Sequence, residues 1–208
     1  MIRVLLADDH QLVREGLKQL LGATADIRVA GEAASGDEVL ALVKAAEFEI
    51  AILDLSMPGL SGIDLVKRVK HEKPALRVLV LSMHGEKQYA ARALKSGASG
   101  YLTKDTASEQ LVAAIRKIAS GGVHISDAAA QQLLASTQPG GASPHASLSD
   151  REYEIFRLIV SGMSLTEIGD KLHLSVKTVS THKTRVQQKL GLNSTADLVR
   201  YAMENGLA

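Results

Sequence analysis

An apolar run that ends in an acid, Ile50-Ala51-Ile52-Leu53-Asp54, constrains the fold of this chain more than any other feature. Its aliphatic and β-branched residues leave no polar face, which indicates a strand covered on both sides, as in a parallel sheet. Ligands bind to such sheets at the carboxyl ends of the strands. Asp54 is therefore placed for chemistry, although an aspartate that only opens the Pro58-Gly59 turn would leave the same pattern.

The first part of the chain alternates strand patterns with amphipathic helix patterns. The predicted strands are residues 2–7, 27–34, 50–54, 77–82 and 100–103. The helical stripes that follow contain Leu12, Leu17, Leu20 and Leu21; Val39 to Val43; Leu65, Val66 and Val69; residues 86–96; and Leu111 to Ile118. Five successive βα units predict an α/β fold, a (βα)5 doubly wound parallel sheet of the flavodoxin and chemotaxis-regulator type.

Two further acids, Asp8 and Asp9, follow the first strand directly. If that strand is a parallel neighbour of the strand ending at Asp54, three carboxylates meet at one edge and repel one another unless a cation or protons compensate. Carboxylate oxygens in an incomplete shell suit Mg²⁺, which also accepts phosphate oxygens as ligands. Such an ion would allow a phosphoryl donor to approach a carboxylate nucleophile.

Two other predicted strands end in polar residues, Ser82 and Lys104. A hydroxyl and an ammonium beside three carboxylates would give an incoming phosphoryl group a hydrogen-bond donor and a counter-charge. Each has an ordinary alternative, because serine is common in turns and most surface lysines are simply solvated. Five polar residues at four strand ends favour a shared site over that alternative.

These motifs resemble the receiver domain of two-component response regulators over residues 1–120. The matching motifs are Asp8-Asp9, Asp54 with Met57-Pro58-Gly59, Ser82, and Tyr101-Leu102-Thr103-Lys104. The resemblance implies that a histidine kinase phosphorylates Asp54, and that Asp9, Asp54 and the main-chain carbonyl of Ser56 bind Mg²⁺ directly, with Asp8 acting largely through water.

The same resemblance implies that Ser82 and Tyr101 are paired switch residues and that Lys104 contacts the phosphoryl group. The sequence departs from the usual pattern at two positions, where Met83 replaces a small residue and Asp105 replaces a proline. The first departure bears on the lifetime of the phosphoryl group, and the second bears on the conformation of the loop.

Other α/β classes fit these residues less well. A nucleotide-binding domain would have a glycine-rich turn after the first strand, where this chain has Asp8-Asp9-His10. An FMN-binding domain would need phosphate donors there instead of acids. A phosphatase with an aspartate nucleophile usually places its general acid two residues later, where Ser56 stands.

The composition changes after the predicted receiver domain. Residues 121–147 are predicted to be a linker containing a short helix within residues 126–136, followed by a Gln-, Pro-, Gly-, Ala- and Ser-rich hinge at residues 137–147. Residues 148–208 are predicted to be a small all-α domain of four helices. Their starts are marked by Ser149 with Glu152, Ser164 with Glu167, Ser175, and Ser194 with Asp197.

The short connection His173-Leu174-Ser175 predicts a helix-turn-helix, although a helical bundle used for dimerisation is an alternative. Charge favours DNA binding, because residues 171–196 contain no acid and five cations. Residues 148–192 resemble the LuxR-type DNA-binding domain, and the whole chain resembles the NarL/FixJ family. This resemblance implies base contacts from Ser180, Thr181 and Thr184, and phosphate contacts from Lys177, Lys183 and Arg185, with Lys183 reaching outward from the apolar side of its helix.

We therefore expect a cytoplasmic transcription regulator, not an enzyme, that is controlled by phosphorylation. The expected partners are a histidine kinase, double-stranded DNA with inverted-repeat half-sites, a second copy of the chain after phosphorylation, and RNA polymerase as a candidate. No membrane association is expected, because acids occur by position 8, and the lack of cysteine fits a reducing compartment. Two alternatives stay open: a DNA-binding regulator that works without phosphorylation, and a phosphotransfer protein whose helical domain binds protein.

Overall fold

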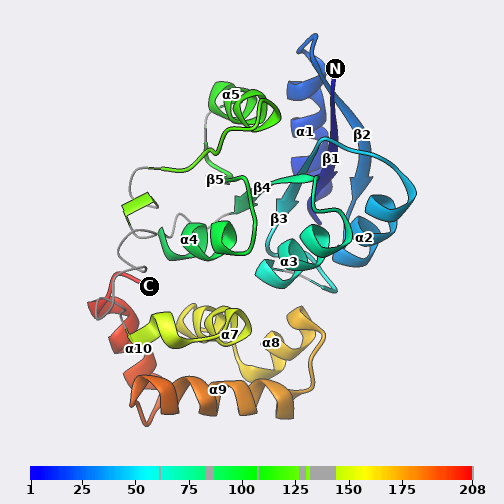
Figure 1. Cartoon of the computed structure of the whole chain (residues 1–208). Helices are drawn as coiled ribbons and strands as arrows, with labels where there is room; N and C mark the ends of the chain where they lie inside the picture. Colours follow the sequence, from blue (N-terminus) through cyan, green and yellow to red (C-terminus); the bar gives the residue numbers. More distant parts are fainter. Residues whose placement is uncertain (61, 83–86, 107, 127–129, 132–143, 208) are drawn as a thin grey trace. The chain divides into compact units, whose positions relative to one another are not determined.

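The computed structural model describes residues 1–207 except 61, 83–86, 107, 127–129 and 132–143. The chain forms two compact units, Met1–Gln132 and Leu133–Ala208 (Figure 1). Each unit has its own set of buried apolar side chains, and each is described by itself below.

The first unit is a five-stranded parallel sheet flanked by helices, which confirms the predicted fold class. The strands are β1 (Ile2–Ala7), β2 (Ile27–Ala33), β3 (Ile50–Asp54), β4 (Arg77–Ser82) and β5 (Gly100–Thr103), in the order β2-β1-β3-β4-β5. The helices are α1 (Gln11–Gly22), α2 (Gly36–Ala45), α3 (Gly62–Glu72), α4 (Lys87–Lys95) and α5 (Ser108–Ala119). Helices α1 and α5 cover one face of the sheet, and α2, α3 and α4 cover the other (Figure 1).

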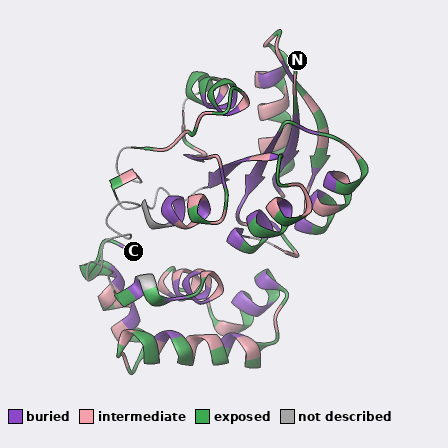
Figure 2. Cartoon of the chain, viewed as in Figure 1, coloured by how far each residue is buried: buried purple, intermediate pink, exposed green. Residues whose placement is uncertain are grey.

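Alternating strand residues divide between the two faces of this sheet. Val4, Ile52 and Leu79 pack with Leu111 and Ile115 of α5 in one cluster of buried residues. All five residues of β3 are buried, as a strand covered on both faces requires (Figure 2). Full burial of one such aliphatic side chain is worth about 1.5–3 kcal/mol, so this strand anchors the polar residues at its end.

The apolar stripe of α1 differs from the prediction at one position. Leu17, Leu20 and Leu21 pack toward the sheet, whereas Leu12 is 88% exposed. Because successive residues turn by 100°, Leu12 lies about 140° around the helix axis from Leu17 and cannot share its face. An exposed leucine therefore stands in the first turn of α1, two residues after His10.

The second unit is built from four capped helices, as the sequence predicts. They are α7 (Asp150–Val160), α8 (Leu165–Leu172), α9 (Val176–Leu190) and α10 (Thr195–Glu204), preceded by the 3-10 turn η1 (Pro144–Ser147). Ser149, Ser164 and Ser194 each form a capping box, and the Ser175 hydroxyl accepts a hydrogen bond from Thr178 N. Such a cap stabilises a helix by roughly 1 kcal/mol.

The turn between α8 and α9 is tight. His173 adopts the left-handed conformation at φ 52°, the only non-glycine residue with positive φ in the described part of the chain. A Cβ atom on Gly169 would lie 2.8 Å from the carbonyl oxygen of Leu174. The close approach needs a glycine at this position, and together these features fix the angle between the two helices.

The short helix predicted within residues 126–136 falls mostly outside the described residues. Ala130 and Gln131 are helical, and Ala130 N donates to the carbonyl of Ser126 at 3.0 Å. The proposed hinge at residues 137–147 is described only from Pro144 onward. In the described ranges, no helix combines the length and apolar character needed to cross a membrane.

Candidate functional site

The register of the sheet brings the predicted acids together at its carboxyl edge. Ala7 of β1 pairs with Leu53 of β3, so Asp8 and Asp54 are the next residues on neighbouring strands. On the other side of β3, Ser82 pairs with Thr103, which places Lys104 beside the same edge. The pairing pattern thus gathers residues that are up to 96 positions apart in the sequence.

Asp54 is almost completely inaccessible, with 1% of its surface exposed. Its Oδ1 accepts a hydrogen bond from Ser56 N at 3.1 Å, and its Oδ2 accepts one from Lys104 Nζ at 2.9 Å. Burial, with a smaller contribution from Asp8, raises the pKa of the Asp54 carboxyl, although Lys104 and the Ser56 amide oppose this change. The carboxylate therefore depends on nearby positive charge to stay ionised.

Lys104 supplies part of that charge and bridges two carboxylates. Its Nζ lies 2.5 Å from Asp8 Oδ2 and 2.9 Å from Asp54 Oδ2. Burial acts to lower the pKa of Lys104, but the hydrogen bonds to Asp8 and Asp54 outweigh it, and the pKa is raised. The lysine is held in place by the strand end as well, because its main-chain N donates to the carbonyl of Ser82 at 2.8 Å.

The acidic pocket fits a divalent cation. The ligand atoms of Asp8, Asp9, His10 and Asp54 all lie within 4.8 Å of one another. Among the described residues, the buried atom Asp9 Oδ1 has no hydrogen-bond partner, and Asp8 Oδ2 has the ammonium of Lys104 at 2.5 Å. One lysine cannot balance three carboxylates, so hard oxygen donors with unused lone pairs remain for a cation.

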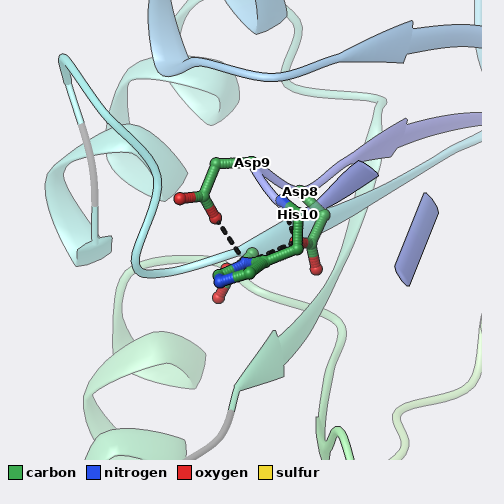
Figure 3. A group of neighbouring side chains, drawn as sticks. Asp8, Asp9 and His10 are labelled. Carbon is green, nitrogen blue, oxygen red and sulfur yellow. Dashed lines mark hydrogen bonds and ion pairs between the residues drawn. The ribbon is translucent and has the colours of Figure 1, made fainter. Parts of the chain in front are cut away.

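Two residues at this edge were missed in the sequence prediction of the site. His10 Nδ1 lies 3.2 Å from Asp8 Oδ1 and 2.9 Å from Asp9 Oδ1 (Figure 3). Arg14 Nη1 donates to the main-chain oxygen of Asp8 at 2.6 Å. The sequence could have indicated His10 as a site residue, because it follows two aspartates directly. The contact of Arg14 with Asp8 could not be predicted in this way, because it depends on where α1 begins.

The remaining predicted receiver residues lie on strands of the same sheet or shortly after one. Ser82 ends β4 and is buried, and Tyr101 of β5 is also buried, with 7% of its surface exposed. Ser56 follows Asp54 by two residues and is partly buried. Met83 lies outside the described residues.

The predicted DNA-contacting residues lie on α9, in the second unit. Lys177, Ser180, Thr181, Thr184 and Arg185 are exposed, and Lys183 is half-buried. The hydroxyls of Thr181 and Thr184 donate to the carbonyls of Lys177 and Ser180, at 2.9 Å and 3.1 Å. A hydroxyl that donates in this way still has acceptor lone pairs, and both threonines are exposed.

One cation of α9 has an internal partner. Lys189 Nζ lies 2.7 Å from Oε2 of Glu152 and also donates to the carbonyl of Ser147 at 3.1 Å. Glu152 is buried and closes the capping box of α7. Lys189 thus ties α9 to α7 and η1, so it contributes less to the basic surface than its sequence position suggested.

Comparison with known families gives two matches in this chain. Residues 4–116 match the family described as "Response regulator receiver domain", and residues 146–202 match "Bacterial regulatory proteins, luxR family". Similar curated proteins include the response regulator UvrY of Escherichia coli (strain K12), 36% identical over all of this chain and 96% of its own length. Another is the response regulator GacA of Pseudomonas protegens, 38% identical over all of this chain and 98% of its own length.

Solved structures with a similar fold include RcsB of Salmonella. The response regulator RcsB from Salmonella typhimurium aligns with a TM-score of 0.75 and 28% identity, over 98% of this chain and 97% of that one. RcsB from Salmonella enterica serovar Typhimurium, bound to promoter rprA in the presence of the phosphomimetic BeF3⁻, aligns with a TM-score of 0.70 and 29% identity, over 96% of this chain and 97% of that one.

Proposed function

Because this chain belongs to the response regulators that join a receiver domain to a LuxR-type DNA-binding domain, we propose that Asp54 is its phosphoacceptor and that phosphorylation controls DNA binding. The chain is a DNA-binding transcription regulator by membership of that family. The observation that carries the assignment of Asp54 is its place at the end of the central strand β3, buried between Asp8 and Lys104.

Phosphoryl transfer begins with the carboxylate of Asp54 as nucleophile. A bond forms between a carboxylate oxygen and phosphorus, while the bond from phosphorus to the kinase's histidine nitrogen breaks and its electron pair stays with that nitrogen. The Ser56 amide orients the Asp54 carboxylate, and Lys104 supplies charge to the arriving phosphoryl oxygens. A Mg²⁺ held by Asp9, Asp54 and the Ser56 carbonyl, and by Asp8 through water, would reduce the repulsion between donor and carboxylate.

The resulting aspartyl phosphate acts through Ser82 and Tyr101. The Ser82 hydroxyl moves to bind a phosphoryl oxygen, and the Tyr101 ring follows it. Lys104 links the two strand ends, because its main chain bonds to the Ser82 carbonyl and its ammonium contacts Asp54. The rearrangement favours a homodimer of receiver domains.

Two linked DNA-binding domains then read inverted-repeat half-sites on double-stranded DNA. Ser180, Thr181 and Thr184 contact base edges, and Lys177, Lys183 and Arg185 contact phosphates. The acceptor lone pairs and the methyl group of Thr184 suit the amino group of adenine or cytosine, or the methyl of thymine. The chain acts in the cytoplasm, where DNA and the kinase domain that phosphorylates it are accessible, and RNA polymerase is a candidate partner.

Labelling with acetyl phosphate and Mg²⁺ tests the phosphoacceptor. The wild-type chain is expected to give a shifted band in phosphate-affinity electrophoresis, and Asp54→Asn is expected to give none. Lys104→Ala is expected to keep some labelling and to lose the response of DNA binding. A shifted band that persists in Asp54→Asn, or no band in the wild type, would show that Asp54 is not the site.

A further inference from the structure

His10 reaches into the acidic pocket, and the proposed phosphoryl transfer leaves its imidazole without a role. We propose that His10 Nδ1 is a ligand of the divalent cation that the pocket binds. The site would then combine nitrogen and oxygen donors and would favour first-row transition metals over Mg²⁺. This inference rests on the proposed function only for the presence of a cation at Asp9 and Asp54.

The separations between donor atoms match those around one octahedral ion. Nδ1 of His10 lies 2.9 Å from Asp9 Oδ1 and 3.2 Å from Asp8 Oδ1 (Figure 3). The candidate donor atoms of Asp8, Asp9, His10 and Asp54 all lie within 4.8 Å of one another. With metal–ligand distances of about 2.1 Å, adjacent ligands of an octahedral ion lie about 3 Å apart and opposite ligands about 4.2 Å apart. The imidazole and the Asp9 carboxylate therefore have the spacing of adjacent ligands.

A single hydrogen bond does not account for both of these contacts. An imidazole nitrogen carries at most one proton, and Nδ1 has hydrogen-bond geometry toward Asp8 Oδ1. Asp9 Oδ1 lies closer to Nδ1, yet this buried atom has no hydrogen-bond partner in the described part of the chain. A shared cation accounts for the shorter contact, because the lone pairs of Nδ1 and of the Asp9 carboxylate would both point to one ion, while Asp8 acts through water.

The backbone of His10 is fixed next to the pocket, which positions its side chain for this role. Its main-chain N donates to Asp8 Oδ1 at 2.8 Å, which fixes the backbone beside the pocket whatever the side chain does. The residue is the N-cap of α1, but its side chain makes no capping hydrogen bond. The side chain is 63% exposed, so it reaches the pocket from the solvent side, and its replacement should cost little stability.

An imidazole ligand changes which ions the pocket prefers. Mg²⁺ is a hard cation that favours oxygen, whereas imidazole suits Ni²⁺, Co²⁺ and other first-row transition ions. His10→Gln keeps a side chain of similar length and removes the imidazole. We expect this variant to lose about tenfold or more in Ni²⁺ affinity relative to Mg²⁺ affinity, as measured by calorimetry on the full-length chain.

Pulsed electron paramagnetic resonance of bound Mn²⁺ detects the nitrogen directly. The full-length chain with one equivalent of Mn²⁺ is expected to show ¹⁴N modulation of imidazole type, which changes to a ¹⁵N pattern when only histidine is ¹⁵N-labelled. His10→Gln should retain bound Mn²⁺ and lose the modulation. Excess Mg²⁺ should release the ion in both proteins, and circular dichroism should show the same helical spectrum for both.

Three results would overturn the inference, and they separate the ligand role of His10 from the cation site itself. Bound Mn²⁺ that depends on Asp9, as shown by its loss in Asp9→Asn, but lacks imidazole modulation would rule out the ligand role of His10 and leave the proposed cation site intact. The same follows if modulation persists in His10→Gln, because another of the seven histidines would be its source. Mn²⁺ binding that Asp9→Asn does not weaken would remove the cation site and the inference together.

Discussion

Lys104 lies between two buried carboxylates, and it balances part of the negative charge of the pocket before phosphorylation. Its ammonium neutralises one charge of the three that Asp8, Asp9 and Asp54 carry, and burial raises the pKa of Asp54 all the same. The remaining negative charge favours a divalent cation. A cation that partly replaces Lys104 as counter-charge would free its ammonium for the phosphoryl group.

Another buried carboxylate, Glu152, gives a pH-dependent prediction for the DNA-binding unit. Burial acts to raise its pKa, but hydrogen bonds from Lys189 and Ser149 outweigh this and hold the pKa below its ordinary value. A carboxyl whose pKa is lowered on folding adds stability above its unfolded pKa, and that stability is lost as the pH falls through the folded value.

We therefore expect Glu152→Gln to destabilise a fragment of residues 144–208 by roughly 1–2 kcal/mol at pH 7. The difference in thermal midpoint between variant and wild type should shrink as the pH falls below the ordinary carboxyl pKa of about 4.3 and through the lower pKa of the folded state, because the wild-type carboxyl then becomes protonated too. Glu167→Gln is the matched control, because Glu167 closes the same kind of capping box on α8 but is exposed. An equal, pH-independent loss in both variants would contradict the role of the Lys189 pair.

At the scale of elements, local patterns in the sequence predicted which helices and strands form. The capping serines and the alternating apolar residues act within one turn or one strand, so their effect can be read without knowing the partner element. Leu12 was wrongly included in the buried stripe, although the turn of 100° per residue already places it about 140° from Leu17. The ion pair of Lys189 could not be read from a local pattern, because its partner Glu152 is 37 residues away.

The site residues that end strands could be predicted from the sequence. The contacts that depend on the conformation of a long side chain or a loop could not. Asp8 and Asp54 are brought together by the register of β1 and β3, which the order of the βα units implies. The contact of Lys104 with Asp8 and the place of His10 between two carboxylates depend on loop geometry. Neither contact leaves a periodic pattern in the sequence.

Helix α9 gives a prediction that separates phosphate contacts from base contacts. Lys177→Ala or Arg185→Ala should weaken binding to all DNA sequences and lower the slope of log affinity against log salt by about one for each lost phosphate contact. Arg200→Ala is the control, because this exposed cation lies on α10. Filter binding across a salt series measures the slopes, and an unchanged slope for both α9 variants would place the DNA on another surface.

Thr184→Ala should have a different effect from the loss of a cation. It should relax the preference at one base position, with about 1–3 kcal/mol at stake for a well-formed contact, and leave the salt slope unchanged. Competition between single-base variants of a selected binding sequence measures this preference. Equal losses on the selected sequence and on random DNA would show that Thr184 does not face a base.

At the scale of the molecule, the 3-10 turn η1 belongs to the packing of the second unit. His145 is buried, its Nδ1 lies 2.8 Å from Tyr201 Oη, and the Ser147 carbonyl accepts from Lys189. A fragment of residues 144–208 should therefore have a higher thermal midpoint than a fragment of residues 148–208. Equal midpoints, or a higher midpoint for the shorter fragment, would show that η1 adds no stability.

We expect a phosphoryl group on Asp54 to increase DNA binding by the second unit through dimerisation. The most direct measurement compares DNA affinity and sedimentation at one salt concentration for three samples: the phosphorylated chain, the unphosphorylated chain and Asp54→Asn treated with the same phosphodonor. The DNA is a sequence selected with the phosphorylated chain. We predict that only the phosphorylated wild type forms the dimer and that it binds about tenfold or more tightly than the other two. An unphosphorylated wild type that binds as tightly and forms the same dimer would contradict this expectation and favour a regulator that works without phosphorylation.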